Sequence, residues 1–240
     1  MRLVTYRTDS QEPDIRRTHG GGARAGVVVD GDRTIVDLQA AYRLRHGQPS
    51  PHLDSVLAII EGGDAALDQA RALVEDRAVD ASVRVDLAAV RLLAPVPQPP
   101  QMRDFLCFEK HLVQAFESVR TMRAQRAPDP AAALAAIAAS GKPAAPAIWY
   151  ERPIFYHPSR FAVCGPETDV VWPAYSDAMD FELEFGCYIG TPGKDITREN
   201  ARQHIFGYTI FNDFSARDEQ TLDMAGQLGP GKGKDFDNAN

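Results

Sequence analysis

Short apolar runs with strand-like spacing open the chain. The run 25–29 is followed by an Asp-Gly turn, and the run 34–38 then returns, so the pattern predicts a β-hairpin. Further strands are predicted at 83–85 and 90–92.

Between these strands, apolar residues recur with the spacing of helices. The periodic segments are 53–60 and 64–74, and Asp64 is a candidate N-cap for the second. Strands and helices in this order predict a small α+β module over residues 1–93.

A proline-rich segment follows this module. Four of the seven residues from 94 to 100 are proline, and proline fixes φ and removes a hydrogen-bond donor. We therefore predict an extended linker at 94–101 and place a second domain at 102–240.

The second domain begins with helical periodicity over 108–125. The segment 131–147 is rich in alanine and proline and is typical of a surface insertion, with room for a short helix. From Pro153 onward, Gly and Pro turns separate short strand-like pieces, and one short helix is predicted from Thr197 as N-cap. The predicted strands are 161–163, 170–172, 181–189 and 208–211. The fold class expected for the chain is therefore α+β and rich in strands.

Acidic and apolar residues alternate strictly in the strand-like segment 180–185. On a strand, Asp180, Glu182 and Glu184 share one face. One interpretation is an amphipathic strand with a solvated acidic face. The other is a bound divalent cation, because crowded like charges repel across a strand and a cation offsets that repulsion.

Two further acids stand where they can join such a site. Asp213 follows the strand-like segment 208–211, and Asp104 follows the proline-rich linker, with His111 seven residues later. Taken singly, each acid is typical of a turn or surface, and His111 is typical of a helix face packed near Leu112.

Composition and charge narrow the class of protein. The chain has 240 residues, 44% of them hydrophobic, and a formal net charge of −7, which does not favour a nucleic-acid partner. Its three cysteines are far apart and form no CxxC pair, which argues against a disulfide framework and structural zinc. Neither a secretory signal nor an apolar run long enough to span a membrane is present in this sequence, so we expect a cytoplasmic protein without membrane contact.

Together these segments resemble the fumarylacetoacetate hydrolase family. The motifs are Asp104-Phe105 with His111, the block Asp180 to Glu184, the block Gly207 to Asp218, and the stretch Gly229 to Asp237. The block from Gly207 reads GYTIFNDFSARD and is long and specific. Residues 1–93 match only as the small leading domain that many members carry.

The resemblance implies a fold, a cofactor and a set of site residues. The fold is a mixed β-roll preceded by the small α+β module, and the cofactor is Mg²⁺, Mn²⁺ or Ca²⁺. The implied metal ligands are Asp104, Glu182, Glu184 and Asp213. The implied catalytic residues are His111 and Lys234, and Arg217 and Gln220 fall on substrate-binding positions. All-oxygen ligand sets of this kind favour hard cations over zinc.

The resemblance also implies a reaction, in which a β-diketo acid is cleaved at a C–C bond. The metal would polarise a carbonyl, His111 would activate water, and Lys234 would stabilise the oxyanion. Alternatives within the family are a decarboxylase, an isomerase, or a hydratase or lyase. The expected partners are a small keto acid and a second copy in a homodimer. Leu106 stands where fumarylacetoacetase has a substrate-contacting tyrosine, so fumarylacetoacetate itself is not the expected substrate.

The family's catalytic domain is longer than residues 102–240. We therefore expect a C-terminally truncated domain, and a non-catalytic fragment that keeps a metal site is an alternative to the enzyme. A generic acidic binding module is the third alternative.

Overall fold

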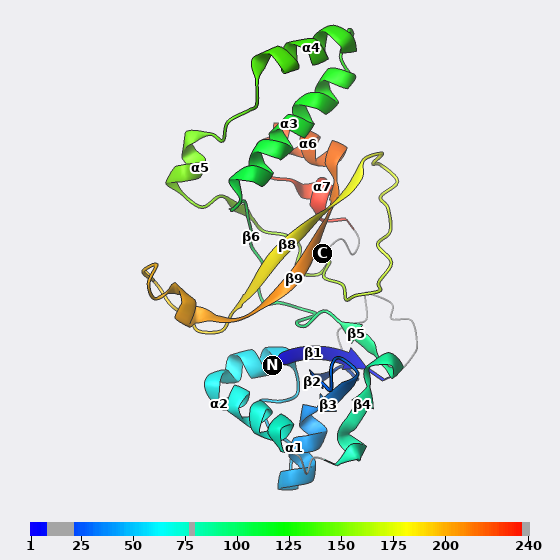
Figure 1. Cartoon of the computed structure of the whole chain (residues 1–240), viewed down its shortest axis with the longest axis vertical. Coiled ribbons are helices and arrows are strands. Elements are labelled where there is room, and N and C mark those ends of the chain that lie inside the picture. Colours follow the sequence, from blue (N-terminus) through cyan, green and yellow to red (C-terminus); the bar gives the residue numbers. More distant parts are fainter. Residues whose placement is uncertain (9–21, 77–79, 237–240) are drawn as a thin grey trace.

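The computed structural model describes residues 1–8, 22–76 and 80–236. Asp237, which the family motif includes, lies outside this range. Figure 1 shows the first five strands with α1 and α2 at one end of the molecule, helices α3 to α5 at the other, and the long β8–β9 ribbon between them.

The N-terminal part holds an antiparallel sheet of order β4-β3-β2-β1-β5. Its strands are β1 (Arg2–Arg7), β2 (Arg24–Val29), β3 (Thr34–Asp37), β4 (Arg84–Asp86) and β5 (Arg91–Leu93). The predicted hairpin is confirmed, since β2 pairs with β3 and Val28 lies opposite Ile35. Strand β1 was not predicted, although it lies between β2 and β5 in the sheet.

Two helices pack on this sheet: α1 (Leu38–His46) and α2 (Val56–Glu75). Helix α1 was not predicted, whereas α2 joins the two predicted helical segments, with a break at Gly63, where φ is 59°. Only glycine adopts this φ and ψ combination without strain. The buried core between helices and sheet includes Val27, Val36, Leu38, Leu53, Ile59 and Leu73. Two 3₁₀ turns, η2 (Ala81–Val83) and η3 (Leu87–Ala89), flank β4.

A buried polar contact ties the sheet to α1. The Tyr6 hydroxyl donates to Asp37 Oδ2 at 2.8 Å, and Arg24 Nη1 donates to the same oxygen at 3.0 Å. The other oxygen of Asp37 caps α1 by accepting from Ala40 N at 2.9 Å. One carboxylate therefore satisfies a buried hydroxyl, a guanidinium and a helix N-terminus.

The second part is organised around the antiparallel pair β8 (Met179–Ile189) and β9 (Ile205–Ala216). The predicted strands 181–189 and 208–211 are confirmed within it. Leu183 of β8 and Ile210 of β9, which lies opposite Phe185, are exposed to solvent, with 78% and 77% of their surfaces accessible. The apolar face of the ribbon is therefore the outer one among the described residues.

Shorter elements surround this ribbon. They are β6 (Asp104–Phe105), α3 (Glu109–Gln125), α4 (Pro130–Ser140), α5 (Ala147–Glu151), β7 (Phe155–Tyr156), the 3₁₀ turn η4 (Ala201–His204), α6 (Arg217–Ala225) and α7 (Gly231–Lys234). Helix α3 confirms the predicted helix at 108–125, and α4 forms within the alanine-rich insertion. Helices α6 and α7 were not predicted. None of the helices in the described ranges combines the length and hydrophobicity that a membrane span requires.

Three local predictions for this part are wrong. Segments 161–163 and 170–172 are irregular, since Pro158, Pro166 and Pro173 interrupt the chain around them and they pair with no described strand. The helix predicted from Thr197 is only the 3₁₀ turn η4, which ends at His204, directly before β9.

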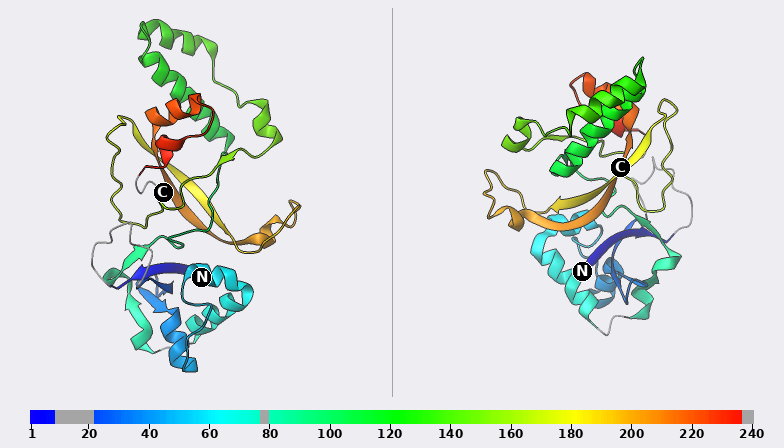
Figure 2. Two further views of the ribbon diagram at one scale, coloured as in Figure 1. Left: turned by 180° about the vertical axis from the view of Figure 1, so that it is seen from behind. Right: turned by 45° about the horizontal axis from the view of Figure 1, so that its top comes forward.

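The two parts meet through the linker and through one end of the ribbon. Residues 94–101 contain neither helix nor strand, and Thr5 Oγ1 donates to Pro95 O at 2.7 Å. Tyr188 and Phe206, at the far end of the ribbon, pack against the N-terminal core. The domain boundary placed at this linker stays a prediction. Figure 2 shows the ribbon from behind, passing between the N-terminal sheet and α6.

We predict that Asp37→Ala destabilises the chain by about 2–4 kcal/mol, because it removes a helix cap and leaves the Tyr6 hydroxyl buried without an acceptor. Asp37→Asn keeps the shape and an acceptor, so we expect a smaller loss. Chemical denaturation of both variants beside the wild type measures the difference. Equal stability of wild type and Asp37→Ala would show that this contact does not support the fold.

Candidate metal centre

The register of the ribbon places acids opposite one another. Glu182 pairs directly with Asp213 across the ribbon, and Glu184 lies two residues further along the same face of β8. This face is turned inward: Asp213 is 0% exposed, and both glutamates are partly buried. The solvated acidic face that a simple amphipathic strand requires is therefore wrong for Glu182 and Glu184. Asp180 alone of the three is exposed.

Asp104 reaches the same place from another part of the chain. It lies on β6, directly opposite Tyr156 of β7. The Tyr156 hydroxyl donates to Asp213 Oδ2 at 3.1 Å, which ties the β6–β7 pair to β9. Beyond Asp104, Leu106 N donates to Ile154 O at 3.0 Å and continues the pairing.

The four predicted ligands lie together. One carboxylate oxygen from each of Asp104, Glu182, Glu184 and Asp213 can be chosen so that all lie within 4.8 Å of one another. Residues from three strands and a sequence span of more than a hundred positions thus form one acidic cluster, which we call the carboxylate cluster. Their role as metal ligands stays a prediction.

Lys234 enters the cluster from α7. Its side chain is 2% exposed, and Nζ lies 2.5 Å from Asp213 Oδ2 and 3.1 Å from Glu182 Oε1. Gly233 makes this approach feasible, because a Cβ there would lie 2.4 Å from Gln220 Cα on α6. The glycine lets α7 pack against α6, and that packing directs Lys234 inward.

Arg217 and Gln220 lie at the edge of the cluster. Arg217 Nη1 donates to Glu182 Oε1 at 2.5 Å and to Gln220 Oε1 at 2.9 Å, and its Nε donates to Asp180 Oδ2 at 2.8 Å. These two predicted substrate-binding residues therefore contact each other and a predicted metal ligand. Substrate binding by either residue stays a prediction.

Two carboxylates of the cluster have no cationic partner among the described ion pairs. Burial, and then the charge of Asp213, raises the pKa of Asp104 to about 6. Burial, and then the charges of Asp104 and Asp213, raises the pKa of Glu184 to about 8. The single buried lysine is thus not enough to balance the cluster, and a divalent cation would supply the missing positive charge.

Lys234 contacts both Glu182 and Asp213, and its charge opposes the effect of burial on the pKa of each. Burial raises the pKa of Glu182, but Lys234 and Arg217 outweigh burial and hold that pKa below its usual range. Burial keeps the pKa of Asp213 raised despite Lys234. The second oxygen of Asp213, Oδ1, is buried without a hydrogen-bond partner in the described structure. An unpartnered carboxylate oxygen inside an acidic cluster fits a metal ligand.

His111 lies in the first turn of α3 and is partly buried. No hydrogen bond or ion pair in the described part of the chain joins it to the carboxylate cluster. Its neighbour Leu112 is buried, as expected for a helix face. The predicted catalytic role of His111 is therefore not supported by a contact and stays a prediction.

Sequence reasoning did not assign roles to Tyr156 and Asp180. Burial, followed by the charge of Asp213, raises the pKa of Tyr156 strongly, so the phenol remains a neutral donor. The alternation of 180–185 placed Asp180 on the acidic face but gave no sign that it pairs with Arg217. Nothing near Tyr156 in the sequence indicated its contact with a strand 57 residues away.

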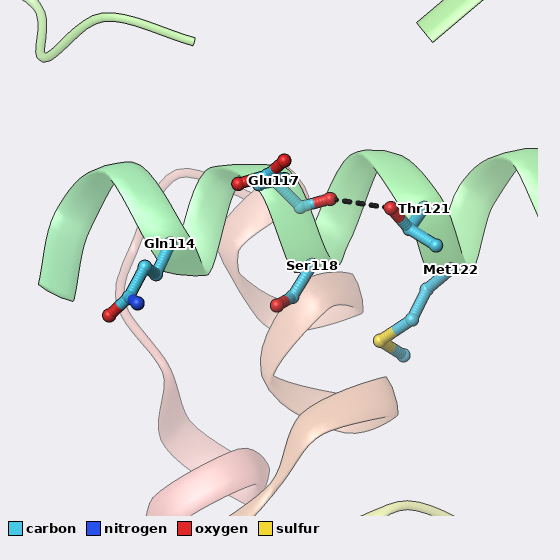
Figure 3. A pocket seen from close by; sticks show the side chains of 5 residues that line it. All are labelled: Gln114, Glu117, Ser118, Thr121 and Met122. Atoms are coloured by element: carbon cyan, nitrogen blue, oxygen red, sulfur yellow. Dashed lines mark hydrogen bonds between the residues drawn. The ribbon is translucent and has the colours of Figure 1, made fainter. Parts of the chain in front are cut away.

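A separate hollow of about 440 Å³ lies along one face of α3. Its lining residues are Gln114, Glu117, Ser118, Thr121 and Met122 (Figure 3). The Thr121 hydroxyl donates to Glu117 O at 2.9 Å, which satisfies it within the helix. No member of the carboxylate cluster lines this hollow, so it does not form part of the candidate metal centre.

Several known proteins are similar to this chain over most of its length. A mitochondrial oxaloacetate tautomerase of Homo sapiens is 29% identical over 222 residues, which cover 92% of this chain and 54% of the relative. An oxaloacetate tautomerase of Bacillus subtilis is 30% identical over 202 residues, which cover 81% of this chain and 57% of the relative. The chain thus spans about half the length of these relatives.

A solved structure shares the fold. The maleylpyruvate hydrolase of Sphingobium sp., in complex with manganese(II) ion and pyruvate, aligns with a TM-score of 0.52 at 22% identity. The alignment covers 90% of this chain and 60% of that one. The predicted fold class is therefore confirmed.

The family model that describes the fumarylacetoacetate (FAA) hydrolase C-terminal domain matches residues 104–240, which is more than half of the chain. This match includes all four acids of the carboxylate cluster together with Lys234. The chain therefore belongs to the fumarylacetoacetate hydrolase family.

Proposed function

We propose that this chain binds a divalent cation and acts on a small 2-keto acid. The observation that carries the proposal is the carboxylate cluster, in which the buried Asp213 keeps one oxygen without a partner. An all-oxygen site suits Mg²⁺, Mn²⁺ or Ca²⁺. Mn²⁺ is the most convenient probe, and the manganese and pyruvate in the Sphingobium hydrolase support both halves of the proposal.

The cation, when bound, would polarise the oxygens of a keto acid and favour enol formation. Asp104, Glu182, Glu184 and Asp213 would hold it. Lys234 would remain beside the cluster and stabilise negative charge on the substrate's oxygen. Arg217 and Gln220 would contact the substrate at the edge of the cluster, and His111 would move a proton once the substrate brings it within reach.

Keto–enol tautomerisation of a 2-keto dicarboxylate is the first candidate reaction. The relatives matched over 81% and 92% of this chain are named oxaloacetate tautomerases. Tautomerisation requires only that a proton be moved between carbon and oxygen of the substrate. It therefore needs no activated water molecule, and no described contact of His111 would position such a water.

Hydrolysis of a C–C bond in a β-diketo acid is the second candidate. The named activity of the Sphingobium relative supports it. It requires a water molecule activated near the cluster, for which His111 is the proposed base.

A homodimer stays part of the proposal for either reaction, and the mass in solution measured by light scattering tests it.

We predict that Glu184→Gln lowers Mn²⁺ affinity by at least about 100-fold, since loss of an outer partner alone costs about 10–100-fold. The amide keeps the size of the side chain but removes a charged ligand. Isothermal titration with Mn²⁺ measures the change. Asp195→Asn is the control, because it also replaces a carboxylate with an amide but on an exposed loop residue. It should leave Mn²⁺ affinity unchanged. Equal affinity of Glu184→Gln and wild type would exclude Glu184 as a ligand.

We predict that Mn²⁺ affinity rises about tenfold from pH 6 to 7 and less steeply as pH approaches 8, because binding must displace the proton that Glu184 holds with a pKa of about 8. The same raised pKa acts on stability without metal. Its contribution is fully present below the ordinary pKa near 4.5 and is lost as pH rises towards about 8.

Melting temperatures measured from pH 5 to 9, with and without Mn²⁺, test both statements. The metal-free protein should lose stability across this range, and the gain from Mn²⁺ should grow. Glu184→Gln should flatten the metal-free profile. A gain from Mn²⁺ that does not depend on pH would contradict the assignment.

We predict that the purified chain with Mn²⁺ accelerates the loss of enol absorbance from oxaloacetate, and that chelation or Glu184→Gln abolishes this. Parallel assays with an acylpyruvate test hydrolysis. His111→Ala should reduce turnover while leaving Mn²⁺ affinity unchanged. Mn²⁺ binding without turnover of either substrate would favour a non-catalytic metal-binding protein, and absence of Mn²⁺ binding would overturn the proposal as a whole.

A further inference from the structure

Asp180 lies outside the carboxylate cluster but is joined to it through one side chain. It stands two residues before Glu182 on the same face of β8. Arg217, the first residue of α6, spans the two: Nε donates to Asp180 Oδ2 at 2.8 Å and Nη1 donates to Glu182 Oε1 at 2.5 Å. Its own backbone N–H donates to Ala178 O at 2.8 Å, which fixes the start of α6 against β8.

Both cations near Glu182 contact the same oxygen. Arg217 Nη1 and Lys234 Nζ each reach Oε1, at 2.5 Å and 3.1 Å. Oε2 has no donor among the described hydrogen bonds. The carboxylate is therefore held through one oxygen, and the other accepts no described hydrogen bond.

The orientation of Arg217 decides whether this arrangement persists. A guanidinium is planar and presents its donors in a fixed fork, so a bond at Nε sets the direction of the Nη groups. Asp180 provides that bond, and Gln220 Oε1 accepts from Nη1 at 2.9 Å on the other side. Without Asp180, the guanidinium of Arg217 is free to rotate and to donate to both oxygens of Glu182. It would then compete with a metal ion for Oε2.

We propose that Asp180 is a positioning residue for the metal centre: by holding Arg217, it keeps Glu182 fixed through Oε1 and leaves Oε2 available to the cation. This inference rests on the proposed metal binding. Asp180 does not itself touch the cation in this proposal.

The test compares Asp180→Ala with Asp180→Asn. Asparagine keeps an oxygen that accepts from Arg217 Nε but carries no charge, whereas alanine removes both. We expect Asp180→Ala to weaken Mn²⁺ binding by about tenfold or more, as is usual for partners behind metal ligands. We expect Asp180→Asn to stay within about threefold of wild type, because the donor retains an acceptor.

Two controls accompany these variants. Asp177→Ala removes an exposed aspartate three residues away whose side chain makes no hydrogen bond or ion pair in the described ranges, so affinity should not change. In an Arg217→Lys background the fork is absent, so Asp180→Ala should cause no additional loss. The EPR spectrum of bound Mn²⁺ should change in Asp180→Ala and resemble that of the wild type in Asp180→Asn.

Circular dichroism and metal-free melting show that each variant is folded. Equal losses in Asp180→Ala and Asp180→Asn would mean that only charge matters and would overturn the proposal. An unchanged affinity in Asp180→Ala, or an undiminished effect in the Arg217→Lys background, would overturn it as well. Failure of the proposed function is distinguishable, because then the wild type itself would not bind Mn²⁺.

Discussion

Repulsion among buried carboxylates is the constraint on which this part of the molecule depends. The register of β8 and β9 sets Glu182 opposite Asp213, and Asp104 and Glu184 lie within reach of both. Burial strengthens every interaction among these charges, favourable or not. Lys234 is buried among them for that reason, and it contacts the two acids that face each other across the ribbon.

The surrounding elements can be understood as support for this arrangement. Helix α7 packs closely on α6 through Gly233 and directs Lys234 inward, while Arg217 at the start of α6 contacts the same oxygen of Glu182 as Lys234 does. The β6–β7 pair contributes Asp104 and, through Tyr156, a hydrogen bond to Asp213. Each ligand candidate thus belongs to an element that is fixed by contacts of its own, which is what a preorganised metal site requires.

The ribbon also has an unusual distribution of polarity. Its acids face inward and its large apolar side chains, such as Leu183 and Ile210, face outward. In a simple amphipathic strand the cost of burying charge forces the opposite arrangement. Here the acids face inward, and Asp104 and Glu184 form no ion pair in the described structure, which supports the proposed cation site.

The sequence by itself determined the composition of the site and several of its supports. The alternation at 180–185 and the block from Gly207 identified the family and the four acids, because family motifs and strand periodicity are local properties of the chain. The hairpin at 25–38 and helix α3 followed from local patterns as well. Only the tertiary structure decided which face of β8 is buried, since period-two alternation is the same for either face.

Contacts between residues that are distant in the sequence were likewise decided only by the tertiary structure. Strand β1 lies within its sheet through pairing with residues more than eighty positions away, and segments 161–163 and 170–172 lack a partner strand despite their strand-like composition. The link from Asp180 through Arg217 to Glu182, and the hydrogen bond from Tyr156 to Asp213, join residues whose sequence neighbours give no sign of them. Local sequence encodes side-chain chemistry and spacing, but distances between remote side chains are fixed only when the strands and helices pack.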